Sequence, residues 1–144
     1  MATDRTANVV WQGDLMNGSG TIAQVPSGAF GPLDVSWAAR AEEPNGKTSP
    51  EELIAAAWAS CFAMALSNVL AKAGNPPEKL ETSATVTFQP GEGIVRGALT
   101  VRGTVPGLDD AGFTAAAETA KQNCPVSKAL SGIPDVSLDA QLAS

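Results

Sequence analysis

Residues 49–66 of the chain read SPEELIAAAWASCFAMAL and predict a long helix of unusual composition. Ser49 and Glu52 fit a capping box, with Pro50 at the first helical position. The helix runs to about residue 73 and stops at the sequence GNPP. Apolar and alanine residues occupy nearly its whole circumference. We therefore expect a helix that is buried on most sides and lies at the centre of the molecule.

Shorter elements flank this helix on both sides. Strands are predicted at residues 6–12, 20–25, within 30–37, at 80–89, at 94–105 and at 135–142. Two further helices are predicted, from Asp109 and Asp110 through Lys121 and from Cys124 to Gly132. The order β-β-β-α-β-β-α-α-β indicates an α+β fold, with an antiparallel sheet wrapped around the central helix. The length of 144 residues predicts a single domain over residues 1–144.

Composition and charge exclude several classes of function. The net charge of -6 argues against binding to nucleic acid or to an anionic membrane surface, because both need basic patches. No apolar run approaches the ~20 residues of a membrane span. Residues 1–12 lack the basic start and apolar stretch of a signal peptide. We therefore expect a cytoplasmic protein without a membrane or nucleic-acid partner, in which a permanent disulfide is not expected.

The chain contains no histidine and two cysteines, Cys61 and Cys124. No Cys-His relay is possible, and two cysteines make a poor metal site, so we expect neither metal nor cofactor. Cys61 lies mid-helix, where it is either a buried core thiol or a nucleophile that needs a nearby cation to form its thiolate. Cys124 precedes Pro125 at a predicted helix start, where it either fills a corner or gains thiolate character from the helix N-terminus. Their spacing alone does not say whether they meet.

Two charged residues before Cys61 have ordinary interpretations when taken singly. Glu51 is an acidic residue in the first turn of a helix, which is a common position for one. Arg40 is predicted at the end of a strand, where arginines are usually solvated.

Taken together, the two cysteine segments resemble a known family. Residues 49–66 are similar to the central helix of the OsmC/Ohr proteins, the osmotically inducible and organic hydroperoxide resistance family. Residues 123–130, NCPVSKAL, resemble its second cysteine motif. Val126 after the proline is more typical of the OsmC branch. The resemblance implies that Cys61 is the peroxidatic cysteine, Cys124 the resolving cysteine, Arg40 the activator of the thiolate and Glu51 the residue that orients the arginine.

The same resemblance implies a thiol peroxidase that reduces organic hydroperoxides and is recycled by an external dithiol, for which the family suggests the lipoyl type. Glu51 and Cys61 are ten residues apart, about 15 Å along one helix. Either the helix breaks between them or Glu51 and Arg40 act on the Cys61 of another subunit. We therefore expect an intertwined homodimer. Two alternatives stay open: a small-ligand-binding protein on the same fold with inert cysteines, and a structural stress protein.

Overall fold

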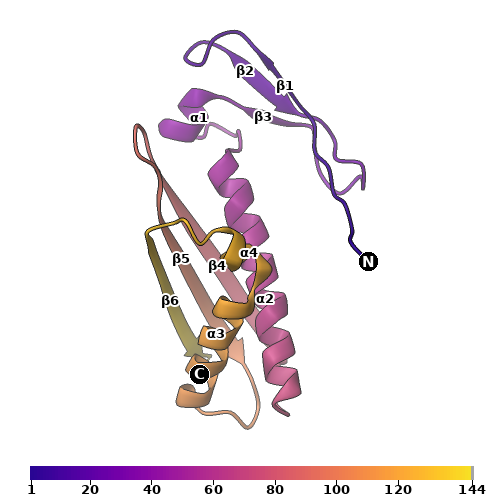
Figure 1. Cartoon of the computed structure of the whole chain (residues 1–144), viewed down its shortest axis with the longest axis vertical. Helices are drawn as coiled ribbons and strands as arrows, with labels where there is room; N and C mark the ends of the chain where they lie inside the picture. Colours follow the sequence, from indigo (N-terminus) through magenta and orange to yellow (C-terminus); the bar gives the residue numbers. More distant parts are fainter. Residues whose placement is uncertain (144) are drawn as a thin grey trace. The chain divides into compact units, whose positions relative to one another are not determined.

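The computed structural model describes residues 1–143, and these residues form two compact units. The first unit is Met1–Leu53, and the second begins at Ile54. The long helix α2 (Pro50–Lys72) begins in the first unit and continues through the start of the second. Figure 1 shows the elements of each unit along the chain.

The first unit is a three-stranded antiparallel sheet with one short helix. Its strands are β1 (Val9–Gln12), β2 (Ser19–Ile22) and β3 (Leu33–Val35), in the order β1-β2-β3. They confirm the predicted strands, although each is shorter than expected. The sequence pattern did not predict α1 (Trp37–Ala41). Arg40 therefore lies on a helix and not at the end of a strand.

Local hydrogen bonds explain where the helices of this unit begin. The hydroxyl of Ser36 accepts from the N–H of Ala39 at 3.1 Å and caps α1, which ends the extended backbone of β3. The hydroxyl of Ser49 accepts from the N–H of Glu52 at 3.2 Å at the start of α2, as predicted. The Glu52 carboxylate accepts from the Thr48 hydroxyl at 2.7 Å, so the reciprocal half of the capping box takes a different partner.

The second unit packs three helices on one sheet. The strands are β4 (Lys79–Gln89), β5 (Gly93–Thr104) and β6 (Asp135–Leu142), and the helices that follow α2 are α3 (Asp110–Asn123) and α4 (Pro125–Ala129). β4 and β5 form the predicted antiparallel hairpin. β6 pairs with β5 in parallel, so the expectation of a purely antiparallel sheet was wrong here. The helices α3 and α4 carry the chain back along the sheet before β6 begins, and such a crossover makes the strands parallel.

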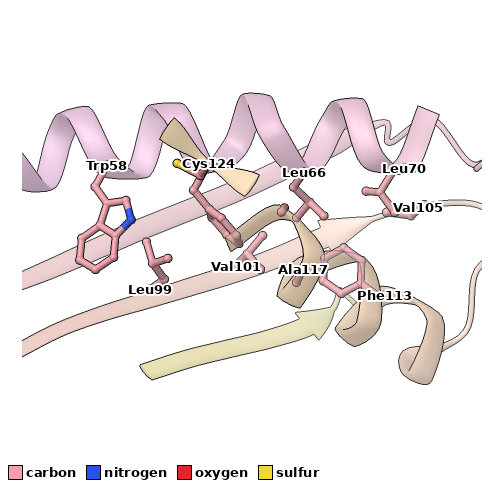
Figure 2. Close-up of a cluster of buried hydrophobic side chains, with 11 residues drawn as sticks. Trp58, Leu66, Leu70, Leu99, Val101, Val105, Phe113, Ala117 and Cys124 are labelled. Carbon is pink, nitrogen blue, oxygen red and sulfur yellow. The ribbon is translucent and has the colours of Figure 1, made fainter. Parts of the chain in front are cut away.

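One face of this sheet and one ridge of α2 form the core. Trp58, Phe62, Leu66 and Leu70 recur every four residues along α2, and each is at most 1% exposed. They pack with Leu99 and Val101 of β5 and with Phe113, Ala117, Ala120 and Cys124. Figure 2 shows these side chains converging between the helices and the sheet. The α+β class and the apolar long helix are thus as the sequence predicted.

The rest of the α2 surface departs from the prediction. The side chain of Met64 is 72% exposed, and Ala56, Ala57 and Ser60 are also exposed. The helix is therefore buried along one ridge and not on most sides. The expectation that no segment approaches a membrane span was also wrong, since α2 is long and apolar enough to cross a membrane when judged by length and composition alone. Its ridge, however, packs into the core of the second unit, and core helices share this composition.

Candidate active site

The structure brings the two cysteines together. Cys61 lies about three turns into α2 and is half-buried, whereas Cys124 has no exposed surface and is the N-cap residue of α4. Both thiols are free, and they lie near enough for each to shift the pKa of the other. Figure 2 shows the Cys124 sulfur directed toward α2. The sequence spacing left open whether the cysteines approach each other, and the fold of the second unit places Cys61 against the core cluster that contains Cys124.

The surroundings of the two sulfurs shift their pKa values in opposite directions. Burial raises the pKa of Cys124, but the N–H of Ser127, the thiol of Cys61, the hydroxyl of Ser127 and the N–H of Val126 together outweigh it, so the pKa lies below the ordinary value. Cys124 makes no capping hydrogen bond of normal geometry, so these N–H groups act on its thiolate chiefly through their partial positive charge.

Cys61 shows the opposite shift. Burial raises the pKa of Cys61, the hydrogen bond to Cys124 and the charge of Cys124 raise it further, and the N–H of Val126 compensates only in part. The surroundings within the second unit therefore favour the thiolate form of Cys124 over that of Cys61. Within the second unit, the surroundings of Cys61 favour its protonated thiol form. A nucleophilic Cys61 thus needs positive charge from elsewhere, as its mid-helix position predicted.

Arg40 and Glu51 form the second predicted pair, within the first unit. The Arg40 Nε–H lies 2.7 Å from Glu51 Oε1 and 3.2 Å from Oε2, so one donor contacts both carboxylate oxygens. The Glu51 side chain is 7% exposed and that of Arg40 32% exposed. Glu51 is the one charged residue classed as buried in the described part of the chain. A buried carboxylate paired in this way fixes the guanidinium, and the ordinary interpretation of Glu51 as a mere first-turn residue does not account for its burial.

Two residues near the cysteines were missed as polar partners. The Trp58 Nε1–H donates to the Ser127 hydroxyl oxygen at 2.8 Å, which links α2 to α4. The sequence analysis used Trp58 only as an apolar residue of the helix. A signal was available, because a buried tryptophan N–H usually finds an acceptor. The sequence could not show which acceptor this N–H finds, because Ser127 lies 69 positions further along the chain.

The cavities differ in their relation to these residues. A cavity of about 320 Å³ in the second unit is lined by Trp58, Ser127, Lys121 and Lys128, among others. A larger one of about 670 Å³ in the first unit is lined by residues of segments 4–7 and 25–30 and by none of the four predicted site residues. The lining of the smaller cavity includes Trp58 and Ser127 but neither of the two cysteines.

Comparison with known proteins places the chain in one family. The family model described as "OsmC-like protein" matches residues 43–139. The peroxiredoxin OsmC of Escherichia coli is 37% identical over 147 residues, which cover 100% of both chains. The organic hydroperoxide resistance protein of Xanthomonas axonopodis pv. citri is 35% identical over 97 residues, or 63% of this chain and 65% of that protein.

A solved structure agrees with these relatives. The crystal structure of an organic hydroperoxide resistance protein OsmC from Legionella pneumophila is similar at a TM-score of 0.66 and 26% identity, and covers 96% of this chain and 97% of that one. Sequence and structural likeness therefore extend over nearly the whole chain. The α+β fold that residues 49–66 and 123–130 implied is the fold of these relatives.

Proposed function

Because the chain belongs to the OsmC-like protein family, we propose that it is a cysteine-based peroxidase that reduces organic hydroperoxides in oxidative and osmotic stress defence. The observation that carries the proposal is the proximity of the two free thiols of Cys61 and Cys124, each of which shifts the pKa of the other. A core thiol or an inert ligand-binding protein has no need of a second cysteine at this place. A nucleophile that must be resolved has such a need.

The chemistry assigns one role to each cysteine. The Cys61 thiolate attacks the distal peroxide oxygen, the O–O bond breaks, and the alkoxide leaves as an alcohol after protonation, with Cys61 oxidised to a sulfenic acid. The Cys124 sulfur then attacks the Cys61 sulfur, an S–S bond forms and the S–O bond breaks, and the departing hydroxide leaves as water. An external dithiol returns both thiols. The reaction needs no prosthetic group, since the peroxide supplies the oxidant and the dithiol the electrons.

Arg40 is proposed to supply the charge that Cys61 lacks within its own unit. A guanidinium beside the sulfur favours the thiolate and the developing oxygen anion, and Glu51 holds the guanidinium in place. The helix α2 is continuous from Pro50 to Lys72, so no break brings Glu51 to Cys61. We therefore propose that Arg40 and Glu51 of one subunit act on the Cys61 of a second copy in an intertwined homodimer.

Exposed apolar surface supports the proposed dimer. Besides Met64 on α2, the exposed large apolar residues of the first unit include Val9, Val10, Trp11, Leu15, Met16 and Phe30. Large apolar side chains left exposed in this number favour a partner that covers them. The proposed place of action is the cytoplasm, because a reducing compartment supplies the dithiols that the cycle consumes, which we propose to be of the lipoyl type.

A peroxide-consumption assay with a dithiol tests the assignment of the cysteines. Wild type is expected to consume an organic hydroperoxide such as cumene hydroperoxide faster than hydrogen peroxide. Cys61→Ser should be inactive, and Cys124→Ser should lose dithiol-dependent turnover while still reacting once with peroxide. A wild-type protein that consumes no organic hydroperoxide would leave the ligand-binding alternative as the better explanation.

A mixing experiment tests the second subunit's part. Cys61→Ser and Arg40→Met are each expected to be inactive alone, but a refolded mixture should regain activity, because one site in each mixed dimer combines an intact Cys61 with an intact Arg40. The control is the double variant mixed with wild type, whose mixed dimers should be inactive. Activity that fails to return in the first mixture would show that Arg40 acts on the cysteine of its own chain.

A further inference from the structure

The dipeptide Asn-Gly occurs twice in the chain, as Asn17–Gly18 and as Asn45–Gly46, and both copies lie in turns of the first unit. Asparagine before glycine is prone to deamidation, because glycine has no side chain to hinder attack of its backbone nitrogen on the neighbouring amide carbon. The side chains of Asn17 and Asn45 are both exposed. The two copies differ, however, in the hydrogen bonds that hold them.

Asn45–Gly46 lies open in the loop between α1 and α2. The φ angles of the two residues are 47° and 80°, and the N–H of Lys47 donates to the carbonyl of Pro44 at 3.0 Å, as in a type I′ turn. Among the hydrogen bonds within residues 1–143, none engages the N–H of Gly46 or the side-chain amide of Asn45. A Cβ built at Gly46 would meet nothing within 4 Å, so the backbone has room beside it for a ring to close.

Asn17–Gly18 is instead held by Asp14. The backbone carbonyl of Asp14 accepts from the N–H of Gly18 at 2.8 Å, and its Oδ1 accepts from the N–H of Asn17 at 2.7 Å. Its Oδ2 lies 3.4 Å from the side-chain nitrogen of Asn17. A Cβ built at Gly18 would collide with the backbone carbonyls of Asp14 and Gln12, so the chain is tightly folded here. One residue therefore holds both the attacking nitrogen and the amide that this nitrogen must reach.

The chemistry of deamidation explains why this difference matters. The backbone nitrogen of the glycine loses its proton and attacks the side-chain carbonyl carbon of the asparagine, a C–N bond forms, and the amide nitrogen leaves as ammonia. Water then opens the cyclic succinimide at either carbonyl and gives aspartate or isoaspartate. A hydrogen bond from the glycine N–H opposes both the loss of the proton and the rotation of the nitrogen toward the side chain.

We propose that Asn45 is a site of spontaneous deamidation in the folded protein, and that Asp14 protects Asn17 from the same reaction. The inference uses the first unit alone and does not depend on the proposed peroxidase function. Each conversion adds one negative charge to the net charge of -6, in the loop between the helices that carry Arg40 and Glu51. The isoaspartate product has its Cβ in the main chain, which is the feature that isoaspartate methyltransferases recognise.

The first test follows both asparagines in one sample of the reduced wild-type chain. The folded protein is aged in mildly alkaline heavy-oxygen water, which labels each new carboxylate, and peptide mapping by mass spectrometry measures the two rates. Asn45 should convert at least about tenfold faster than Asn17, because reaction at Asn17 must first break bonds that include one to a charged carboxylate. In guanidinium chloride the same chain should convert both at nearly equal rates. Equal rates in the folded protein, or a faster rate at Asn17, would refute the proposal.

The second test removes the protecting carboxylate. Asp14→Ala should speed the conversion of Asn17 about tenfold and leave the rate at Asn45 unchanged. The matched control is Asp4→Ala, because within residues 1–143 the Asp4 carboxylate is hydrogen-bonded to neither asparagine. This control should change neither rate. An unchanged rate at Asn17 in Asp14→Ala would overturn the protective role of Asp14.

Isoelectric focusing of the aged protein supplies an independent readout. Wild type should gain a more acidic band with time, and methylation by an isoaspartate methyltransferase should appear with it. Asn45→Gln should gain this band much more slowly, since the longer side chain closes its ring less readily. If Asn45→Gln became acidic as fast as wild type, the new charge would arise elsewhere and the assignment to Asn45 would be wrong.

Discussion

The replacement Gly97→Ala should destabilise the second unit by a predictable amount. Gly97 lies on the buried face of β5, and a Cβ built there would lie 2.5 Å from Cζ3 and 2.6 Å from Cη2 of Trp58. Ordinary contact begins near 3.4 Å, so the indole would have to move by about 0.9 Å. The indole is 1% exposed, and the hydrogen bond to Ser127 opposes its displacement.

The magnitude follows from two opposing effects. Overpacking of a close-packed core costs about 1–3 kcal/mol. Alanine also reduces the entropy of the unfolded chain, which offsets about 0.4–1 kcal/mol. The net loss of unfolding free energy should therefore be about 1–2 kcal/mol, which corresponds to a fall in melting temperature of about 2–8 °C for a chain of this size.

Urea unfolding of the reduced protein, carried out at one fixed protein concentration, measures this loss of unfolding free energy. The matched control is Gly132→Ala, because a Cβ at Gly132 meets nothing within 4 Å. The control should change the free energy of unfolding by less than about 0.5 kcal/mol. If Gly97→Ala were as stable as Gly132→Ala, the close approach of the Trp58 indole to Gly97 would be refuted.

Three further predictions concern packing, charge and pH. Leu66→Ala removes a side chain with no exposed surface and should lower the free energy of unfolding by about 3–5 kcal/mol in the same urea assay. Asp135→Asn removes the exposed Arg96 pair, whose atoms are 3.1 Å apart, and should change stability by less than about 1 kcal/mol, with no further change in high salt. The stability of wild type relative to Cys61→Ser/Cys124→Ser should peak near the ordinary thiol pKa of about 8.5. The lowered pKa of Cys124 adds stability that is complete above that pH and is lost as pH falls through the folded pKa of Cys124. The raised pKa of Cys61 adds stability that is complete below that pH and is lost as pH rises through the folded pKa of Cys61. A monotonic pH profile of this difference would contradict the opposite shifts.

Contacts made far along the chain were beyond the sequence pattern. The parallel pairing of β5 with β6 depends on how α3 and α4 return the chain, and a pattern of alternating residues is the same in either direction. The short helix α1 was missed because five residues are too few to show a helical period, although Ser36 marks its start. The expected burial of α2 on most sides was also wrong, because burial depends on which distant parts of the chain cover the helix. Composition indicates how much apolar surface a helix has, but not whether the same chain covers it.

The sequence alone determined the long helix, most of the shorter elements and the candidate chemistry. Residues 49–66 and 123–130 fixed the long helix, the helix start at Cys124 and the family, because capping residues, helical periodicity and motif spacing are local properties of a chain. The tertiary structure decided which of these residues meet. The proximity of Cys61 and Cys124, the burial of Glu51 against Arg40 and the bond from Trp58 to Ser127 all depend on how the elements pack. Packing also set the electrostatics: a thiol gains or loses its proton according to the burial and the hydrogen-bond donors around it, and these come from residues that the linear sequence does not bring together.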